Sequence, residues 1–321
     1  MKHFLVIRFS SIGDIVLCTP IFRLLKKRFP DSKITFVTKS KFSQIIENNQ
    51  FVDSILCWDK PEDRAELFAM QFDAIVDLHS NLRSKLVKMR FWQVPSVSVK
   101  KKNFSKLLYT LTKWNCFKVD SIVDRSIEIL SPWGIQNDRE GLDFESVKID
   151  SEFIKFNQFM VVVLGGTYAT KRIPENKLEE LFVKMHKINA VLIGGKEESE
   201  IGARLEAKFA DRVQSMCGKL GIKESAEVIR LSQVVISGDT GMSHIAAAMG
   251  RPLGLIWGNT GSGYGMSPVV KQGVELKQFE VEGLGCWPCS KLGYEACPKG
   301  HFKCMEAQNM EEVGKFVEKY L

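Results

Sequence analysis

Segment 234–250 carries residue types and a spacing suited to binding a phosphate group. Its first residues are apolar and predict a buried strand, and its small residues predict a helix that begins directly after a tight turn. The first N–H groups of such a helix lack partners and lie at its positive dipole end, which attracts phosphate. Asp239, Thr240 and Gly241 form the turn, and His244 follows on the first helical turn. An ordinary turn in which Asp239 or Thr240 only caps the helix fits these residues equally well.

Asp14 lies in a second strand–loop–helix unit, at the start of the chain. Ligands of open parallel sheets collect at the carboxyl ends of the strands, where such connections lie. A carboxylate there can take the proton of an attacking hydroxyl, and a structural helix cap is the alternative. Two carboxylate-bearing turns, one in each half of the chain, predict a cleft between two domains.

A third loop, 165–174, combines glycines and hydroxyl groups with Lys171. Such a loop can wrap a diphosphate with the lysine as a point charge, and a flexible surface loop is the alternative. Glu197 follows the next predicted strand, where a carboxylate could accept a hydrogen bond from a ribose or sugar hydroxyl. Glutamate is also favoured in any first helical turn, so this residue alone identifies no site.

Four clustered cysteines near the end of the sequence begin with a Cys-x-x-Cys pair, which is typical of tetrahedral zinc sites. His301 is a rival fourth ligand, and the second pair is spaced more widely than in a usual zinc knuckle. A structural zinc, reduced cysteines that pack a loop, and disulfides stay open as interpretations. The cluster consists of Cys286, Cys289, Cys297 and Cys304.

Apolar strand patterns alternate with amphipathic helical patterns along the chain, which predicts an α/β protein with parallel sheets covered by helices on both faces. The predicted strands are 4–8, 34–38, 54–58, 74–78, 96–99, 160–164, 190–193, 234–237, 253–257 and 274–279. The predicted helices are 17–28, 41–48, 62–70, 82–90, 103–114, 121–132, 174–187, 197–210, 222–232, 241–249 and 310–321.

The length of 321 residues favours two domains of about 150 residues each. Weak periodicity and many charges place the linker at 135–158. We therefore expect an acceptor-binding Rossmann-like domain at 1–150 and a donor-binding one at 151–321, with the last helix packing back on the first domain.

Positive charge is concentrated in one segment of the chain. Residues 81–119 contain ten lysines and arginines, no Asp or Glu, and several interleaved aromatic and apolar residues, within a net charge of +7. Such a segment attracts phosphate-rich partners, and an anionic membrane surface or a phosphorylated lipid fits it well. Nucleic acid is less expected because no recognised nucleic-acid-binding motif occurs. A solvated basic face is the alternative.

Several classes of protein are disfavoured. No Gly-x-Gly-x-x-Gly, P-loop, His-Glu-x-x-His or Gly-x-Ser-x-Gly motif is present. Arg8 and Asp14 interrupt the first apolar run, and no stretch approaches the roughly 20 apolar residues of a membrane span. We expect a cytoplasmic protein in peripheral contact with the inner face of the inner membrane.

Three segments together resemble the ADP-heptose:lipopolysaccharide heptosyltransferases, a bacterial family of GT-B glycosyltransferases with two Rossmann-like domains facing a central cleft. They are the Arg-Phe-Ser-Ser-Ile-Gly-Asp segment within 6–20, the Lys-Arg-Ile-Pro segment within 165–174, and Ser-Gly-Asp-Thr-Gly-Met-Ser-His within 237–248. Segments 77–84 and 252–268 are similar to further parts of the family. The resemblance covers nearly the whole chain.

The resemblance implies inverting transfer of a heptose from ADP-L-glycero-D-manno-heptose to the lipopolysaccharide inner core, on a phosphorylated lipid A–Kdo type acceptor, with no metal required for catalysis. It implies that Asp14 is the general base. The implied donor-binding residues are Thr167, Lys171, Glu197, Asp239, Thr240, Gly241 and His244, and the implied acceptor-binding residues are Ser11, Gly13, His79 and Arg83.

Two alternative functions are kept. One is another GT-B transferase or a sugar-nucleotide epimerase that uses a different nucleotide sugar. The other is a non-catalytic protein that binds a glycan or nucleic acid, against which the presence of both Asp14 and the Asp239 turn argues.

Overall fold

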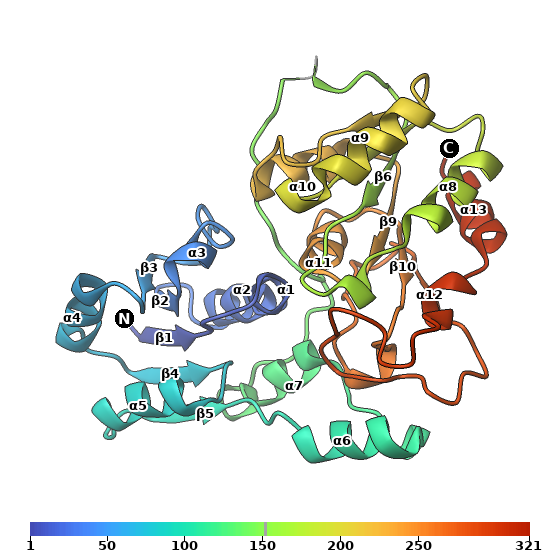
Figure 1. Ribbon diagram of the computed structural model, residues 1–321. Coiled ribbons are helices and arrows are strands. Elements are labelled where there is room, and N and C mark those ends of the chain that lie inside the picture. Colours follow the sequence, from blue (N-terminus) through green and yellow to red (C-terminus); the bar gives the residue numbers. More distant parts are fainter. Residues whose placement is uncertain (151–152) are drawn as a thin grey trace. The chain divides into compact units, whose positions relative to one another are not determined.

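The computed structural model describes residues 1–150 and 153–321. The chain forms two compact units (Figure 1). Unit 1 comprises Met1–Asn103 and Asp120–Glu145, and unit 2 comprises Phe104–Val119 and Ser146–Leu321. The predicted boundary between residues 150 and 151 adjoins the two residues that lie outside the described ones, and it stays a prediction.

Unit 1 is built on a five-stranded sheet with the order β3-β2-β1-β4-β5, in which every pair of neighbours is parallel. Its strands are β1 (His3–Ile7), β2 (Lys33–Thr38), β3 (Ser54–Cys57), β4 (Ala74–Asp77) and β5 (Ser96–Ser98). Its helices are α1 (Ile12–Val16), α2 (Thr19–Arg28), α3 (Ser40–Ser43), α4 (Pro61–Ala69), α5 (Leu82–Arg90), α7 (Ile122–Glu128) and the 3₁₀ turn η2 (Ser131–Trp133).

Both faces of this sheet are covered, as expected for strands joined by helical crossovers. Leu67 of α4 and Val87 of α5 pack with alternate strand residues such as Leu5 and Ile75 on one face. On the other face Phe22 of α2 meets Phe36 of β2, with ring centroids 5.2 Å apart. The sheet therefore has a fixed carboxyl edge on which the residues after β1 and β4 are held.

Unit 2 contains a six-stranded parallel sheet with the order β11-β10-β9-β6-β7-β8. Its strands are β6 (Met160–Val163), β7 (Ala190–Ile193), β8 (Val213–Ser215), β9 (Val234–Gly238), β10 (Leu253–Ile256) and β11 (Leu276–Phe279). Its helices are α6 (Asn103–Thr112), α8 (Glu175–Lys184), α9 (Ser199–Lys208), α10 (Ile222–Leu231), α11 (Gly241–Ala248), α12 (Lys303–Glu306) and α13 (Met310–Glu318), with 3₁₀ turns η1 (Asn115–Phe117), η4 (Ala169–Lys171), η5 (Lys196–Glu198) and η6 (Ser262–Tyr264).

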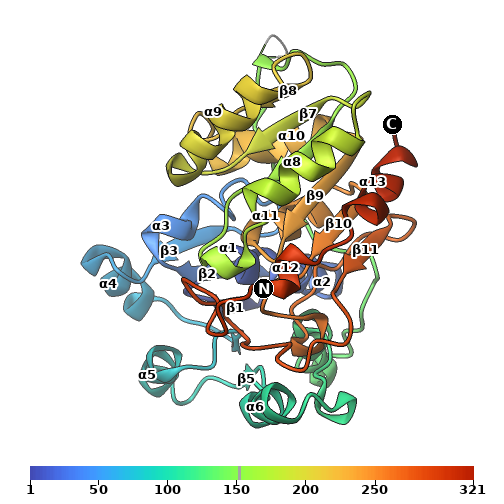
Figure 2. The ribbon, with the colours of Figure 1, turned by 45° about the vertical axis from the view of Figure 1, so that its right-hand side comes forward.

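One face of the second sheet carries α8, α9 and α13, whose apolar residues form one cluster with alternate strand residues. Figure 2 shows α13 beside α8 and near β10. Helix α13 contributes Val313 and Phe316 to this cluster, so its apolar side packs within unit 2. Its expected packing on the first domain stays a prediction.

Every predicted strand is present within two residues of its expected ends, and the structure adds β8, which is too short and too polar to form a clear pattern. Two expectations need correction. The loop expected between the first strand and the helix at 17–28 contains α1, and the helix expected at 41–48 is limited to Ser40–Ser43. Ser11 and Asp14 form a capping box that begins α1, and this explains why a short helix forms there.

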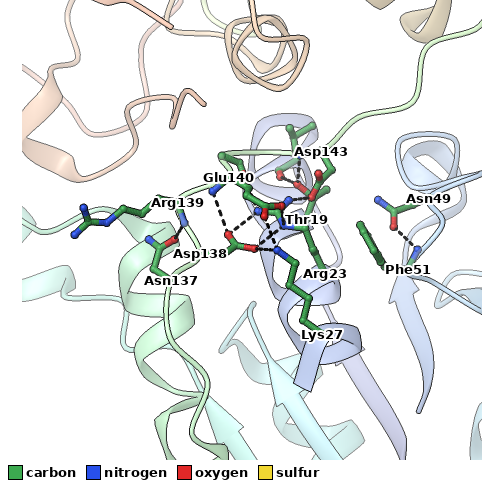
Figure 3. A network of polar contacts seen from close by, with 12 residues as sticks. Thr19, Arg23, Lys27, Asn49, Phe51, Asn137, Asp138, Arg139, Glu140 and Asp143 are labelled. Carbon is green, nitrogen blue, oxygen red and sulfur yellow. Dashed lines mark hydrogen bonds and ion pairs between the residues drawn. The ribbon is translucent and has the colours of Figure 1, made fainter. Parts of the chain in front are cut away.

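A buried arginine attaches the last segment of unit 1 to α2 (Figure 3). The Arg23 side chain is 4% exposed and lies within 2.9 Å of Asp138, and it also pairs with Asp143. Its Nη2 donates to the carbonyl of Gly141 over 2.8 Å. Lys27 adds a more exposed ion pair with Asp138 at 2.8 Å. Segment 138–143 is therefore held by these charges together with the fully buried side chain of Leu142.

Among the helices in the described part of the chain, none is both long enough and apolar enough to cross a bilayer.

Candidate active site

Asp14 is the third residue of α1, at the carboxyl edge of the first sheet. Its Oδ1 lies 2.5 Å from Nη2 of Arg8, and its Oδ2 accepts hydrogen bonds from the backbone N–H and the hydroxyl of Ser11 over 3.0 and 2.7 Å. Burial raises the pKa of Asp14, but Arg8 and these Ser11 bonds outweigh it and hold the pKa below its ordinary value. The carboxylate is therefore ionised at neutral pH.

Arg8 is itself fixed by the backbone around it. Its Nε donates to the carbonyl of Ser10 over 2.8 Å, and its Nη1 donates to the carbonyl of Leu78, which follows β4, over 2.5 Å. Arg8 thus links the ends of the two central strands and sets the position of Asp14. The sequence analysis named this arginine only as part of a motif and assigned it no role. The carbonyl of Leu78, to which it donates, lies 70 residues away in the sequence.

His79 follows β4 and belongs to the same group of residues. Its ring packs edge-on against Phe9, with centroids 5.3 Å apart. Burial, followed by the charges of Arg8 and Lys101, lowers the pKa of His79 to about 4, so the ring is neutral at neutral pH. A neutral imidazole near a carboxylate suits the binding of sugar hydroxyls, since one ring nitrogen donates and the other accepts.

The structure brings Ser11, Asp14 and His79 together around Arg8. The other two predicted acceptor-binding residues, Gly13 and Arg83, are placed differently. Gly13 is buried inside α1, and Arg83 lies on the first turn of α5 with its side chain exposed. The roles assigned to all five residues stay predictions.

Lys171 and Asp239 form the charged centre of unit 2. Lys171 ends η4, and its Nζ lies 2.7 Å from Oδ2 of Asp239, which is 8% exposed. The same carboxylate oxygen accepts a hydrogen bond from the Thr260 hydroxyl over 2.8 Å. An ammonium group has three donors, so this ion pair leaves donors for a phosphate oxygen. Asp239 therefore orients the Lys171 ammonium group and leaves it N–H donors for a ligand.

Two glycines let the Lys171 loop pass close to the strand ends. A Cβ on Gly238 would lie 2.1 Å from the carbonyl oxygen of Lys171, and a Cβ on Gly258 would lie 2.1 Å from that of Thr170. Neither contact is possible for a larger residue, so the backbone approach requires glycine at both positions. The Lys171 side chain is thereby held at the ends of β9 and β10.

Thr240 is the N-cap of α11, and Gly241 begins the helix. The Thr240 side chain makes no cap hydrogen bond. A Cβ on Gly166 would lie 3.3 Å from the Thr240 methyl group, so the glycine-rich loop runs beside this helix end. His244 follows on the first turn and is 4% exposed. The structure thus joins the first helical turn, with its positive dipole end, to the Lys171–Asp239 pair.

Thr167 and Glu197, the other two predicted donor-binding residues, are more exposed. Thr167 lies exposed in the glycine-rich loop. Glu197 has 79% of its side chain exposed and pairs with Arg172 over 3.0 Å. Arg172 also donates to the Gly166 carbonyl over 2.7 Å and so shapes the loop. Sequence reasoning did not single out Arg172 or Thr260 as site residues. All donor-binding roles stay predictions.

The four clustered cysteines are free thiols. Burial, followed by the neighbouring Cys289, Cys297 and Cys286, raises the pKa of Cys304 to about 12. Cys286 lies 3.7 Å from Nε2 of His301. In the described part of the chain, no group of three or more histidine, cysteine or acidic side chains is arranged to hold a metal ion. The structural zinc stays a prediction and enters no step of the chemistry.

Solved structures share this two-unit arrangement. A glycosyl transferase family 9 protein from Veillonella parvula matches with a TM-score of 0.75 and 18% identity over 99% of this chain and 97% of its own. The ADP-heptose lipopolysaccharide heptosyltransferase II of Escherichia coli matches with a TM-score of 0.72 and 16% identity over 100% and 98%. These matches show the fold of the chain, which has two Rossmann-like units of the GT-B architecture, as predicted.

A family model described as glycosyltransferase family 9 (heptosyltransferase) matches residues 64–279. The chain is also 23% identical to lipopolysaccharide heptosyltransferase 1 of Escherichia coli over 87% of its length and 95% of that protein. It is 20% identical to lipooligosaccharide heptosyltransferase 2 of Haemophilus influenzae over 82% and 85%. The chain belongs to glycosyltransferase family 9, the heptosyltransferases.

Proposed function

We propose that this glycosyltransferase transfers a heptose from ADP-L-glycero-D-manno-heptose to a sugar of the lipopolysaccharide inner core, with inversion at the anomeric carbon and without a catalytic metal. The observation that carries the proposal is the Lys171–Asp239 ion pair at the first turn of α11. An Escherichia coli heptosyltransferase of the same fold, solved with ADP-2-deoxy-2-fluoro heptose, supports the choice of donor.

Unit 2 would bind the donor through its diphosphate. The N-terminus of α11 supplies backbone N–H groups and about half a positive charge, and Lys171 supplies a full one. Both act on the charge that develops on the departing ADP as the glycosidic bond breaks. Asp239 and Thr260 hold the lysine in place before the donor arrives. This arrangement offers the stabilisation that other transferases obtain from a divalent cation.

Unit 1 would supply the base. An inverting transfer needs one group to take the proton of the acceptor hydroxyl while its oxygen attacks the anomeric carbon. Asp14 is ionised because Arg8 and Ser11 outweigh its burial. The neutral ring of His79 would orient the acceptor through its nitrogen atoms. The ion pair with Arg8 makes Asp14 a weak base, so the acceptor must lie in direct contact with the carboxylate for proton transfer.

The acceptor would be a phosphorylated lipid A–Kdo type molecule. Such an acceptor is held in a bilayer, so the enzyme would make peripheral contact with the anionic inner face of the inner membrane. The basic segment 81–119, which has no acidic residue, supports this contact.

Turnover of nucleotide sugars tests the proposal. ADP-L-glycero-D-manno-heptose should be consumed in the presence of a lipid A–Kdo acceptor and of EDTA, and the product anomer determined by NMR should be inverted. UDP-, GDP- and CMP-sugars should give no product. Turnover of one of these donors would replace the proposed donor, and epimerisation of a donor without transfer to the acceptor would replace the reaction itself.

A further inference from the structure

Helix α6 presents its apolar side to solvent. Phe104, Leu107 and Leu111 are 72%, 54% and 68% exposed, and Trp114, just beyond the helix end, is 64% exposed. At 100° per residue, the three helical positions lie within a stripe about 60° wide. Exposed aromatic and leucine side chains in such a contiguous stripe mark an interaction surface rather than scattered surface residues. We name these four residues the α6 stripe.

The opposite side of α6 is the one that docks on unit 2. Tyr109 is 3% exposed, and its ring packs edge-on against Tyr264 with centroids 5.3 Å apart. The hydroxyls of Thr110 and Tyr264 are 2.8 Å apart, and the N–H of Val119 donates to the Gly263 carbonyl over 2.9 Å. A Cβ on Gly263 would lie 2.5 Å from the Tyr109 ring, so the two elements are in close contact. The α6 stripe is therefore exposed on a helix that is firmly attached to unit 2; Figure 1 shows the course of α6.

The charged residues of segment 81–119, which contains the α6 stripe, all have one sign. Lys100, Lys101 and Lys102 precede the helix with exposed side chains, Lys118 follows it, and no acidic residue occurs from 81 to 119. An apolar stripe flanked by lysines is the pattern of a helix that lies in the plane of a membrane surface. Anionic lipid head groups complement these lysines, and tryptophan is favoured at the head-group level.

Helix α5 in unit 1 repeats the pattern independently. Leu82, Leu86 and Met89 lie one or two turns apart on this helix and are 74%, 52% and 69% exposed. Trp92, two residues after the helix end, is 77% exposed. Val87 of the same helix is buried in the core of unit 1. In each unit one of these two helices thus buries one side and exposes an apolar side, within a segment that contains only basic charges.

We propose that α6 lies flat on an anionic bilayer, with the α6 stripe among the upper acyl chains and the flanking lysines at the lipid phosphates. This inference extends the membrane contact of the proposed function, on which it rests, and assigns the apolar part of that contact to α6 of unit 2. It requires neither a particular donor nor a particular sugar acceptor.

Vesicle flotation of the full-length chain tests the assignment. Wild-type protein should float with vesicles of phosphatidylcholine and phosphatidylglycerol, bind at least tenfold less to phosphatidylcholine alone, and dissociate as salt is raised. The double substitution Leu107→Ser/Leu111→Ser should lower binding to anionic vesicles at least tenfold. Val183→Ser is the matched control, because Val183 is 63% exposed on α8 and lies outside the basic segment. It should bind as wild type does.

Two further measurements separate the possible failures. Thermal unfolding and ADP affinity should be the same for wild type and Leu107→Ser/Leu111→Ser, since both leucines are exposed. Unchanged flotation of this variant would overturn the assignment. The assignment would also be overturned if light scattering showed that wild-type protein is a dimer and the variant a monomer, while neither protein binds vesicles. Vesicle binding without ADP-heptose turnover would instead refute the proposed donor and leave the membrane surface standing.

Discussion

The guanidinium of Arg8 lies 2.5 Å from the carboxylate of Asp14, and the same guanidinium donates to the carbonyl of Leu78. One arginine thus sets both the charge state and the position of the proposed base.

Asp14→Asn should lower kcat by at least a hundredfold, because general base catalysis contributes about 10²–10⁴-fold and an amide cannot accept the proton. Steady-state kinetics with ADP-heptose measures the loss. ADP affinity by calorimetry should stay within twofold of wild type, because the proposed donor residues lie in unit 2. Turnover at the wild-type rate would remove Asp14 from the chemistry.

Arg8→Gln should move the acidic limb of the kcat/KM profile to higher pH. The pKa of Asp14 is held low against its burial by Arg8 and by Ser11, so removing the Arg8 charge lets burial raise it. In wild type the Asp14 contribution to stability is present above the ordinary carboxylate pKa of about 4 and is lost as pH falls through the lower folded pKa. Arg90→Gln, an exposed arginine of unit 1, is the control and should leave the limb in place. An unshifted limb in Arg8→Gln would show that another group titrates.

Lys171→Ala should weaken ADP binding by about ten- to a hundredfold, as expected for the loss of a charge-assisted hydrogen bond of about 1.5–3 kcal/mol. Adenosine, which lacks the diphosphate, should bind both proteins equally, and calorimetry with the two ligands distinguishes a phosphate contact from a general loss of structure. Lys187→Ala changes an exposed lysine of the same unit and serves as the control. Equal weakening of ADP and adenosine would argue against the diphosphate contact.

Gly238→Ala should destabilise unit 2 by about 1–3 kcal/mol, the usual cost of overpacking. The new methyl group would meet the carbonyl oxygen of Lys171, so the loop must move and ADP affinity should fall with stability. Denaturant unfolding and calorimetry measure the two effects. Gly285→Ala is the matched control, because a Cβ there has no neighbour within 4 Å. An ADP affinity equal to wild type would mean that the loop position does not matter for the nucleotide.

Arg23→Met should destabilise unit 1 by about 3–5 kcal/mol, because it leaves the carboxylates of Asp138 and Asp143 without their buried partner. Burial raises the pKa of Asp138, but Arg23 and Lys27 outweigh it and hold the pKa well below its ordinary value. The difference in the free energy of unfolding between wild type and Arg23→Met should therefore become smaller as the pH falls and these carboxylates are protonated. Lys27→Met is the comparison, and its exposed ion pairs should contribute about 0–1 kcal/mol. Equal effects of the two substitutions in urea titrations would contradict the ranking.

The sequence was sufficient for every strand except β8, because buried parallel strands such as Met160–Val163 form apolar runs that alternate with helices. Asp14, Lys171 and Asp239 stood out because they lie in the segments that follow β1, β6 and β9, and their roles stay predictions. The sequence could not reveal the role of Arg8, whose backbone partner Leu78 is distant in sequence. The capping box of Ser11 and Asp14, in contrast, was a local signal that would have predicted α1.

Two other features depend on contacts between distant parts of the chain. The need for glycine at position 238 comes from the Lys171 carbonyl, which no local pattern contains. The assignment of α6 to unit 2 comes from the contact of Tyr109 with Tyr264. A helical pattern indicates which side of a helix is apolar, but only the fold decides whether that side is covered.

The chain passes from unit 1 to unit 2 at residue 103, returns at 120, and leaves again after 145. A chimera made by joining the first 150 residues of one relative to the remainder of another would therefore pair a foreign Tyr109 with a resident Tyr264. Exchange of complete donor-binding halves between transferases requires three junctions. Recombination at a single point would carry the 104–119 insert with the wrong parent.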